Sequence, residues 1–250
     1  MNAITVSLLV FSFAFGGALL GLFLRPRLPQ HHLSSESKDT VKIGMGLVGT
    51  MSALLLSLLV ASAKSSYDEK KNEITQMAAK IAFLDRVLAN YGPQTADQRT
   101  MLRTYVAGAI DGIWPHERVA TATAVPTHNA EAFYDSLHQL APETELQHGL
   151  KDKALDLAAD LGLARWLLFE QSGTSISLPF LIVTVLWLTM IFISFGLFAP
   201  PNATVVCTLI LCASSVSGAL FLVLELDRPY SGVIQISSAP MRMALSSLGQ

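Results

Sequence analysis

Four polar residues recur at intervals of seven: Thr50 and Ser57 inside a long apolar segment, and Lys64 and Lys71 after it. This interval keeps side chains in one slowly drifting line along an α-helix. Hydroxyl groups can replace part of the hydration shell of an ion, and rings of ammonium groups raise the local concentration of anions. In an oligomer this line predicts the wall of a path for small ions, with a hydrophobic gate formed by Leu54, Leu58 or Ala61.

Helix packing is the alternative interpretation of the same residues. Gly46, Gly49 and Ala53 flank the line, and small residues let membrane helices approach closely. Serine and threonine hydroxyls can also bond back to the carbonyl four residues earlier, and Lys64 can extend to the lipid headgroups. A second small-residue face, Gly17 with Gly21, predicts another helix contact.

No pattern of catalytic or metal-binding residues accompanies this line. The six histidines form no H-x-x-x-H motif and lack a cysteine partner. Cys207 and Cys212 lie five residues apart and so on different faces of one helix. The sequence contains no G-x-S-x-G, Walker or G-x-G-x-x-G motif. We therefore expect neither an enzyme nor a cofactor or metal.

The element that carries the line is one of four long apolar segments without an acidic or basic residue: Ile4–Leu24, Ile43–Ala63, Leu178–Phe198 and Val205–Leu224. About 20 helical residues span the roughly 30 Å of hydrocarbon in a bilayer. Hydrophobic residues make up 51% of the chain and the net charge is −2, which leaves no basic surface for nucleic acid. The lipid bilayer is the first predicted partner.

These segments divide the chain into four regions. Residues 1–63 hold two transmembrane helices, 64–174 form a helical cytoplasmic domain, 175–226 hold two more transmembrane helices, and 227–250 form a C-terminal tail. A narrow excess of lysine and arginine near the ends of the spans favours a cytoplasmic N-terminus and domain. The predicted fold is an all-α membrane protein with a two-plus-two arrangement of spans around this domain.

Between the pairs of spans, the pattern is helical almost throughout. The second spanning helix lacks breakers as far as Gly92-Pro93, so we expect it to continue to about Asn90. An apolar stripe on this extension indicates packing on partner helices: Ile74, Met77, Ile81, Leu84 and Leu88. Thr95 to Gln98 resembles a capping box, and further helices are expected at about Asn129–Leu140 and Glu143–Gln171, with Pro142 in the first turn of the latter. Glu117–His128 is the expected loop, and Ser238 and Pro240 can start a final helix.

Charged residues follow the last span directly. Glu225, Asp227 and Arg228 lie at the membrane boundary, where Pro229 prevents the helix from continuing unkinked. Arg228 is a candidate for coupling the last span to the domain, through Glu170 or a neighbouring subunit. Anchoring at the lipid–water interface is the simpler alternative.

Three runs of sequence carry a resemblance: Gly46–Ile74 with its ASAKSSYD motif, AAKIAFLDRVLANYGPQT at Ala78–Thr95, and Leu224–Arg242 with its ELDRPYSG motif. They resemble the bacterial bestrophin-like membrane proteins, over nearly the whole chain. The resemblance implies an oligomeric ion channel in the bacterial inner membrane, with a pore lined by the second span and five subunits. Calcium gating is not implied, because Leu226 and Arg228 interrupt the acidic run. A membrane-anchored scaffold or sensor, whose domain binds a partner, is the alternative function.

Overall fold

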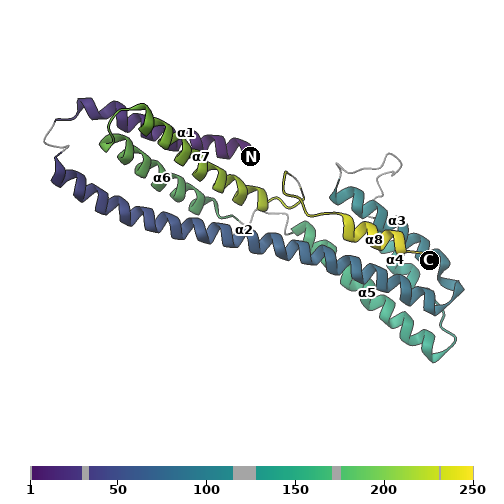
Figure 1. Ribbon diagram of the computed structural model, residues 1–250. Helices are drawn as coiled ribbons and strands as arrows, with labels where there is room; N and C mark the ends of the chain where they lie inside the picture. Colours follow the sequence, from purple (N-terminus) through teal and green to yellow (C-terminus); the bar gives the residue numbers. More distant parts are fainter. Residues whose placement is uncertain (1, 30–33, 115–127, 171–175, 231, 250) are drawn as a thin grey trace. The chain divides into compact units, whose positions relative to one another are not determined.

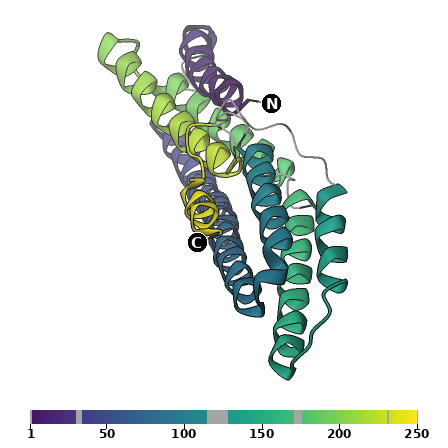
Figure 2. The same cartoon turned by 90° about the vertical axis from the view of Figure 1, so that its right-hand side faces the viewer.

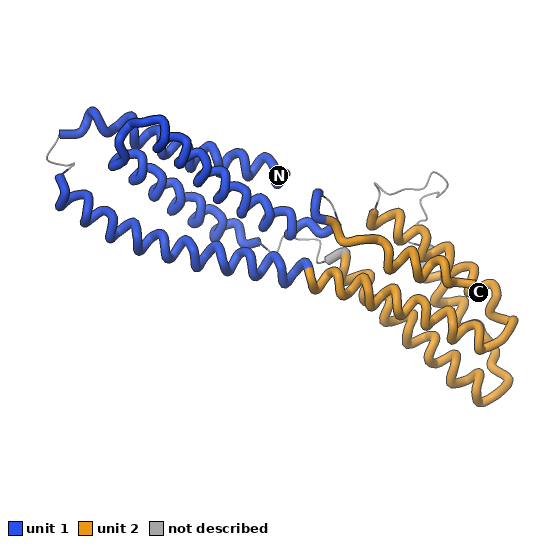
Figure 3. The backbone as a smooth tube through the Cα atoms, in the orientation of Figure 1, with its two compact units in different colours: residues 1–67, 174–234 blue, residues 68–173, 235–250 orange. Residues whose placement is uncertain are grey.

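The computed structural model describes residues 2–29, 34–114, 128–170, 176–230 and 232–249, and its regular elements are helices (Figure 1). The chain divides into two compact units (Figure 3). Residues 1–67 and 174–234 form the first unit, and residues 68–173 and 235–250 form the second. The last residues of the tail thus belong to the unit that is built from the central part of the sequence.

The first unit contains four helices that are long and apolar enough to cross a membrane: α1 (Ala3–Leu24), the first part of α2 (Ser35–Tyr91), α6 (Leu178–Phe198) and α7 (Ala203–Leu226). A short 3₁₀ turn, Arg25–Arg27, follows α1. The chain is therefore a multi-pass membrane protein, as the apolar segments predict. Each helix satisfies its own backbone hydrogen bonds, which the lipid interior requires.

Helix α1 packs against both α6 and α7 within this unit (Figure 1). Apolar side chains of α1, α2, α6 and α7 share one buried cluster that includes Val10, Leu59, Leu181 and Leu220. Polar contacts add to it: the Ser217 hydroxyl donates a 2.6 Å hydrogen bond to the carbonyl of Ser7. At the other end of α1, Arg25 donates to the carbonyl of Ala199, which is otherwise unpaired after the last turn of α6.

Helix α2 is a single element of 57 residues. It confirms the prediction that the second spanning helix continues past Lys64 to about Asn90. It ends at Tyr91 because Gly92 adopts a φ of +133°, a conformation that other residues rarely take, and Pro93 follows. The residues that line this helix therefore keep one helical register from Ser35 to Tyr91.

The second unit is a helical bundle around the end of α2 (Figure 2). Its other helices are α3 (Ala96–Ile113), α4 (His128–His138), α5 (Glu145–Glu170) and α8 (Ala239–Ser247), and a 3₁₀ turn at Pro93–Thr95 joins α2 to α3. The predicted apolar stripe of α2 is buried here, with Ile74 and Leu84 fully inaccessible to solvent. The stripe is covered by the chain itself, so it supplies no reason for self-association.

Several local predictions need correction. Thr95 does not cap α3 with its side chain; it is buried, and its hydroxyl donates to the carbonyls of Leu88 and Gly92. The Leu88 carbonyl belongs to the last turn of α2, where helical partners are missing, so the hydroxyl closes α2 and not α3. Helix α5 begins three residues after Pro142. The predicted loop lies outside the described residues, except that His128 begins α4.

The last part of the tail, residues 235–250, is fixed within the second unit on both sides of α8. The Trp114 indole donates a 2.8 Å hydrogen bond to the carbonyl of Ile236, before α8. After α8, the amide of Gly249 donates to Asp85, which also accepts two 2.8 Å hydrogen bonds from Arg99. Burial alone would raise the pKa of Asp85, but these bonds and the positive charge of Arg99 lower it below its ordinary value. Ser238 and Pro240 do precede and begin the final helix, as predicted.

Candidate functional site

The predicted path-lining residues share one solvent-accessible face of α2: Thr50, Leu54, Ser57, Leu58, Ala61 and Lys64 in the first unit, and Lys71 in the second. Leu54 and Leu58 are 72% and 54% exposed. On the opposite side of the same helix, Ser52, Leu59 and Ala63 are buried against the chain. The seven-residue interval therefore does mark a single face, and the chain itself leaves that face uncovered.

Helix α2 is the least covered of the four spans. Of its most apolar 18 residues 11% are buried, against 33% in α1 and 22% in each of α6 and α7. A membrane helix with a neighbour along one side only presents the rest of its surface to lipid, to water or to another chain. A helix that faces only lipid has no need of the hydroxyl groups on this surface, and the glycines leave room there for another helix.

The small residues predicted to pack fall into two groups. Gly17 and Gly21 lie against α6, where a Cβ added to Gly21 would overlap the backbone of Ile193 and Leu197. Gly46 and Gly49 have no atom within 4 Å of such a Cβ, and Ala53 is exposed. The first group is used inside the chain, whereas the second group meets no other helix in the part of the chain that the structure describes.

The polar groups of the line differ in what they offer. The Thr50 hydroxyl donates to the carbonyl of Leu47 at 2.8 Å, so its hydrogen is occupied and its oxygen can only accept a further hydrogen bond. The Lys64 ammonium lies 5.5 Å from the centre of the Tyr67 ring, a cation–π distance, and the residue is still exposed. Lys71 is exposed as well. The only formal charges on this line are therefore positive.

The three charged residues after the last span have distinct surroundings. Glu225 is buried, and its carboxylate accepts a 2.6 Å hydrogen bond from the amide of Val233. The chain can fold back so closely because Gly232 has a φ of +109° and any side chain there would meet this carboxylate. Asp227 is buried and Arg228 half-buried. The side chain of Glu170, the suggested partner of Arg228, lies outside the described residues.

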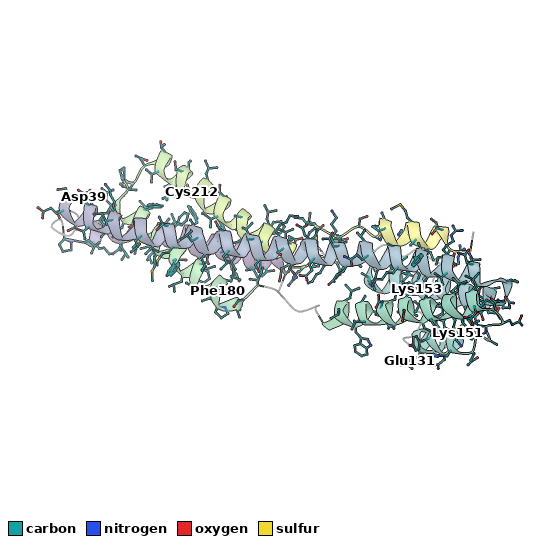
Figure 4. The ribbon with its side chains drawn as sticks, turned by 90° about the horizontal axis from the view of Figure 1, so that it is seen from below. Asp39, Glu131, Lys151, Lys153, Phe180 and Cys212 are labelled. Atoms are coloured by element: carbon teal, nitrogen blue, oxygen red, sulfur yellow. The ribbon has the colours of Figure 1, made fainter. Side chains whose placement is uncertain are left out.

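The turn held by Glu225 was missed by the sequence interpretation, which considered only the charges of the ELDRPYSG motif. Its signal is the glycine seven residues after the glutamate, because a glycine that ends such a motif often marks a tight turn. Elsewhere in the described part of the chain, no group of three histidine, cysteine or acidic residues is placed to hold a metal ion. Both cysteines are free and exposed on α7, and Figure 4 labels Cys212.

Comparisons with known proteins agree with the helical arrangement. The Bestrophin-like domain model matches residues 12–241. A variant of a bacterial bestrophin homologue from Klebsiella pneumoniae shares 16% identity and a TM-score of 0.72, covering 99% of this chain and 97% of its own. A second variant of that homologue gives 17% identity and a TM-score of 0.67, with 96% and 97% covered. These identities support a shared fold. Comparison with curated proteins gave no match.

Proposed function

The chain belongs to the bestrophin-like family, and from this premise we propose that it is the subunit of a homo-oligomeric channel for small ions. The path runs along the open face of α2, with Thr50 and Ser57 in the membrane and Lys64 and Lys71 toward the domain. Members of this family are typically channels and not enzymes. The proposal assigns Leu54, Leu58 and Ala61 to a hydrophobic constriction beside Ser57.

One observation carries the proposal: the line of hydroxyls and lysines coincides with the face of α2 that the chain does not cover. A line of polar residues that only served packing within the chain would be buried. Exposure in a bilayer demands another explanation, because lipid is a poor environment for ammonium groups near a span. Water between several copies of α2 provides the matching environment.

The proposal requires more than one copy, since one chain of four spans has no room for an aqueous path. Gly46, Gly49 and Ala53 supply a small surface on which a neighbouring copy can approach α2. Five subunits is the number that resemblance to bestrophins suggests. Native mass spectrometry in detergent should show one defined oligomer, and a monomer at all working concentrations would remove the proposal.

Selectivity should favour anions, but weakly. Two lysines per subunit attract anions, yet mobile salt screens charges over a Debye length of about 8 Å at physiological ionic strength. At a wide mouth the lysines therefore bias concentration more than they select. The Thr50 hydroxyl does not add to the attraction for anions, because its hydrogen is donated to Leu47 and its oxygen is an acceptor.

We also propose the bacterial inner membrane as the location, with both termini and the domain cytoplasmic. Cysteines introduced at Asp152 of α5 and at Pro201, both exposed, should react with impermeant reagents from opposite sides of the membrane. Reaction of the two from the same side would contradict this topology. Reaction at Asp152 from outside and at Pro201 from the cytoplasm would show the opposite orientation.

Ion flux into liposomes that contain the purified protein is the direct test. Ser57→Trp should reduce flux without changing the oligomer, because an indole replaces a hydroxyl at the constriction. Met190→Trp is the matched control: Met190 is 45% exposed in the middle of another span, α6, and is not on the face of α2 that holds Ser57 and Leu58. If the native protein gives no flux, or if both variants give equal flux, the channel proposal fails and the scaffold or sensor function replaces it.

A further inference from the structure

Helix α5 presents one long exposed face whose chemistry changes along its length. Four acidic residues occupy the first part of this face, namely Glu145, Asp152, Asp156 and Asp160, and three large apolar residues occupy its last two turns, namely Leu163, Trp166 and Leu167. At about 100° per residue, the six residues from Asp152 onward fall within roughly a third of the helix circumference. We call the three apolar residues the α5 patch.

The patch is exposed although its residues are of types that proteins usually bury. Trp166 is 75% exposed, Leu163 62% and Leu167 42%. The opposite side of α5 is already used, because Leu157 and Leu161 are buried and Arg165 contacts the Tyr105 ring and hydroxyl of α3. Neighbouring large apolar residues on an outward face indicate a surface that something else covers.

The position of the patch along the chain indicates what covers it. Helix α5 ends at Glu170 and the spanning helix α6 begins at Leu178. Eight residue steps at no more than about 3.5 Å each bring the end of α5 within roughly 28 Å of the start of a span. The apolar residues lie at this end of the exposed face, while the acidic residues lie farther back. Exposed Leu146, in the first turn, lies outside the line of the face.

We infer that the α5 patch lies in the headgroup layer of the bilayer, with Trp166 as its anchor. Tryptophan concentrates at membrane interfaces because its ring is apolar and its N–H needs a polar partner. The acidic residues stop at Asp160, which keeps carboxylates in water, and the apolar residues begin three positions later. A second copy of the chain that covered this face would give no reason for this sorting of charged and apolar residues toward the span.

Tryptophan quenching by lipids tests the inference in the full-length protein. The chain has three tryptophans, and each has a different expected environment. Trp114 is buried in the second unit, Trp187 lies near the middle of α6, and Trp166 belongs to the patch. Protein in phosphatidylcholine liposomes would be measured with nitroxide labels placed either at the headgroup or deep in the acyl chain.

The contribution of Trp166 is the difference between the native protein and Trp166→Phe, a mild change at an exposed position. We expect the headgroup label to cause a larger loss of this contribution than the deep label. The difference between the native protein and Trp187→Phe should show the reverse order and serves as the depth control.

Two results would overturn the inference. Quenching of Trp166 by aqueous acrylamide but by neither lipid label would place the patch in water. Protection of Trp166 from acrylamide and from both labels would mean that protein, such as a second copy, covers it. Neither result depends on ion flux, so failure here leaves the proposed channel untouched, and loss of flux leaves this inference untouched.

Discussion

Two glycine-bearing helix faces in the same unit have opposite surroundings. On α1, Gly17 and Gly21 meet α6 so closely that a methyl group at Gly21 would overlap the backbone, and Gly196 of α6 is equally confined. On α2, Gly44, Gly46 and Gly49 face open space. We call the first the closed face and the second the open face. Glycine lets backbones approach in the closed face, whereas in the open face it leaves room that the chain does not fill.

The comparison indicates that small residues in a membrane helix can have two different roles. In the closed face they determine how one chain folds, so a substitution there should reduce stability. In the open face they border the line of Thr50, Ser57 and Lys64, so a substitution there should alter conduction or assembly and leave the folding of one chain intact. The predictions that follow test this separation.

The largest effect is expected in the second unit, where a buried and an exposed residue of α2 are neighbours in the sequence. Asp85 is buried with Arg99 and the tail, and Arg86 is exposed. Asp85→Ala should lower the free energy of unfolding by about 3 kcal/mol, because Arg99 loses its ion pair with Asp85 in a poorly hydrated site. Arg86→Ala is the control and should change it little. Denaturant titration in detergent, followed through the signal of buried Trp114, measures both; equal effects would contradict the prediction.

The same pair has a pH dependence whose sign follows from the lowered pKa of Asp85. The folded protein holds the proton of Asp85 less tightly than the unfolded chain does. In the unfolded chain the pKa of this carboxyl group has its ordinary value of 3.8. The stabilisation is therefore complete above about pH 3.8 and is lost as the pH falls through the folded pKa. Asp85→Asn should lack this part of the acid destabilisation.

A smaller effect is expected from adding one methyl group to each glycine face. Gly21→Ala should destabilise the protein by about 2 kcal/mol, because the new Cβ meets backbone atoms that no side-chain rotation can move. Gly49→Ala has space and should cause no loss. Thermal unfolding in detergent compares the two variants. Destabilisation by Gly49→Ala at concentrations where the protein is monomeric would show that the open face is closed within the chain.

Chemical accessibility sharpens what the open face contacts. In a background of Cys207→Ser and Cys212→Ser, a cysteine at Ser57 should react with an impermeant, water-soluble thiol reagent in liposomes. A cysteine at Thr184, fully buried in α6, should not react. Met190→Cys, 45% exposed on α6 and not on the open face, distinguishes water from lipid. If Ser57→Cys is as unreactive as Thr184→Cys, no water reaches this face.

The smallest effect is expected from a single charge at the mouth. Lys64→Glu should move the reversal potential across a salt gradient toward cation preference, by only a small amount because salt screens the charge. Lys153→Glu, at an exposed position on α5 and not on α2, makes the same charge change and should leave the reversal potential unchanged; Figure 4 labels Lys153. Equal shifts from both variants would mean that overall charge, and not position on α2, controls ion preference.

The sequence by itself determined the properties that depend on neighbours along the chain. The length of the apolar segments predicted the four spans, because a helix that crosses a membrane must pass through about 30 Å of hydrocarbon. The absence of glycine and proline between Gly49 and Tyr91 predicted the continuous α2, and the interval of seven predicted a single polar face. Each of these follows from helix geometry, which needs no knowledge of what else the helix meets.

Tertiary structure alone decided which residues meet across long separations in the sequence. It placed Gly21 against α6 and left Gly49 uncovered, although both are small residues in apolar helices. It turned the Thr95 hydroxyl toward the end of α2 and joined the tail at Gly249 to Asp85. These contacts depend on the packing of segments that lie 164 positions apart in the case of Asp85 and Gly249, and 176 in the case of Gly21 and Leu197. Helical periodicity specifies which face a residue occupies but not which helix will cover that face.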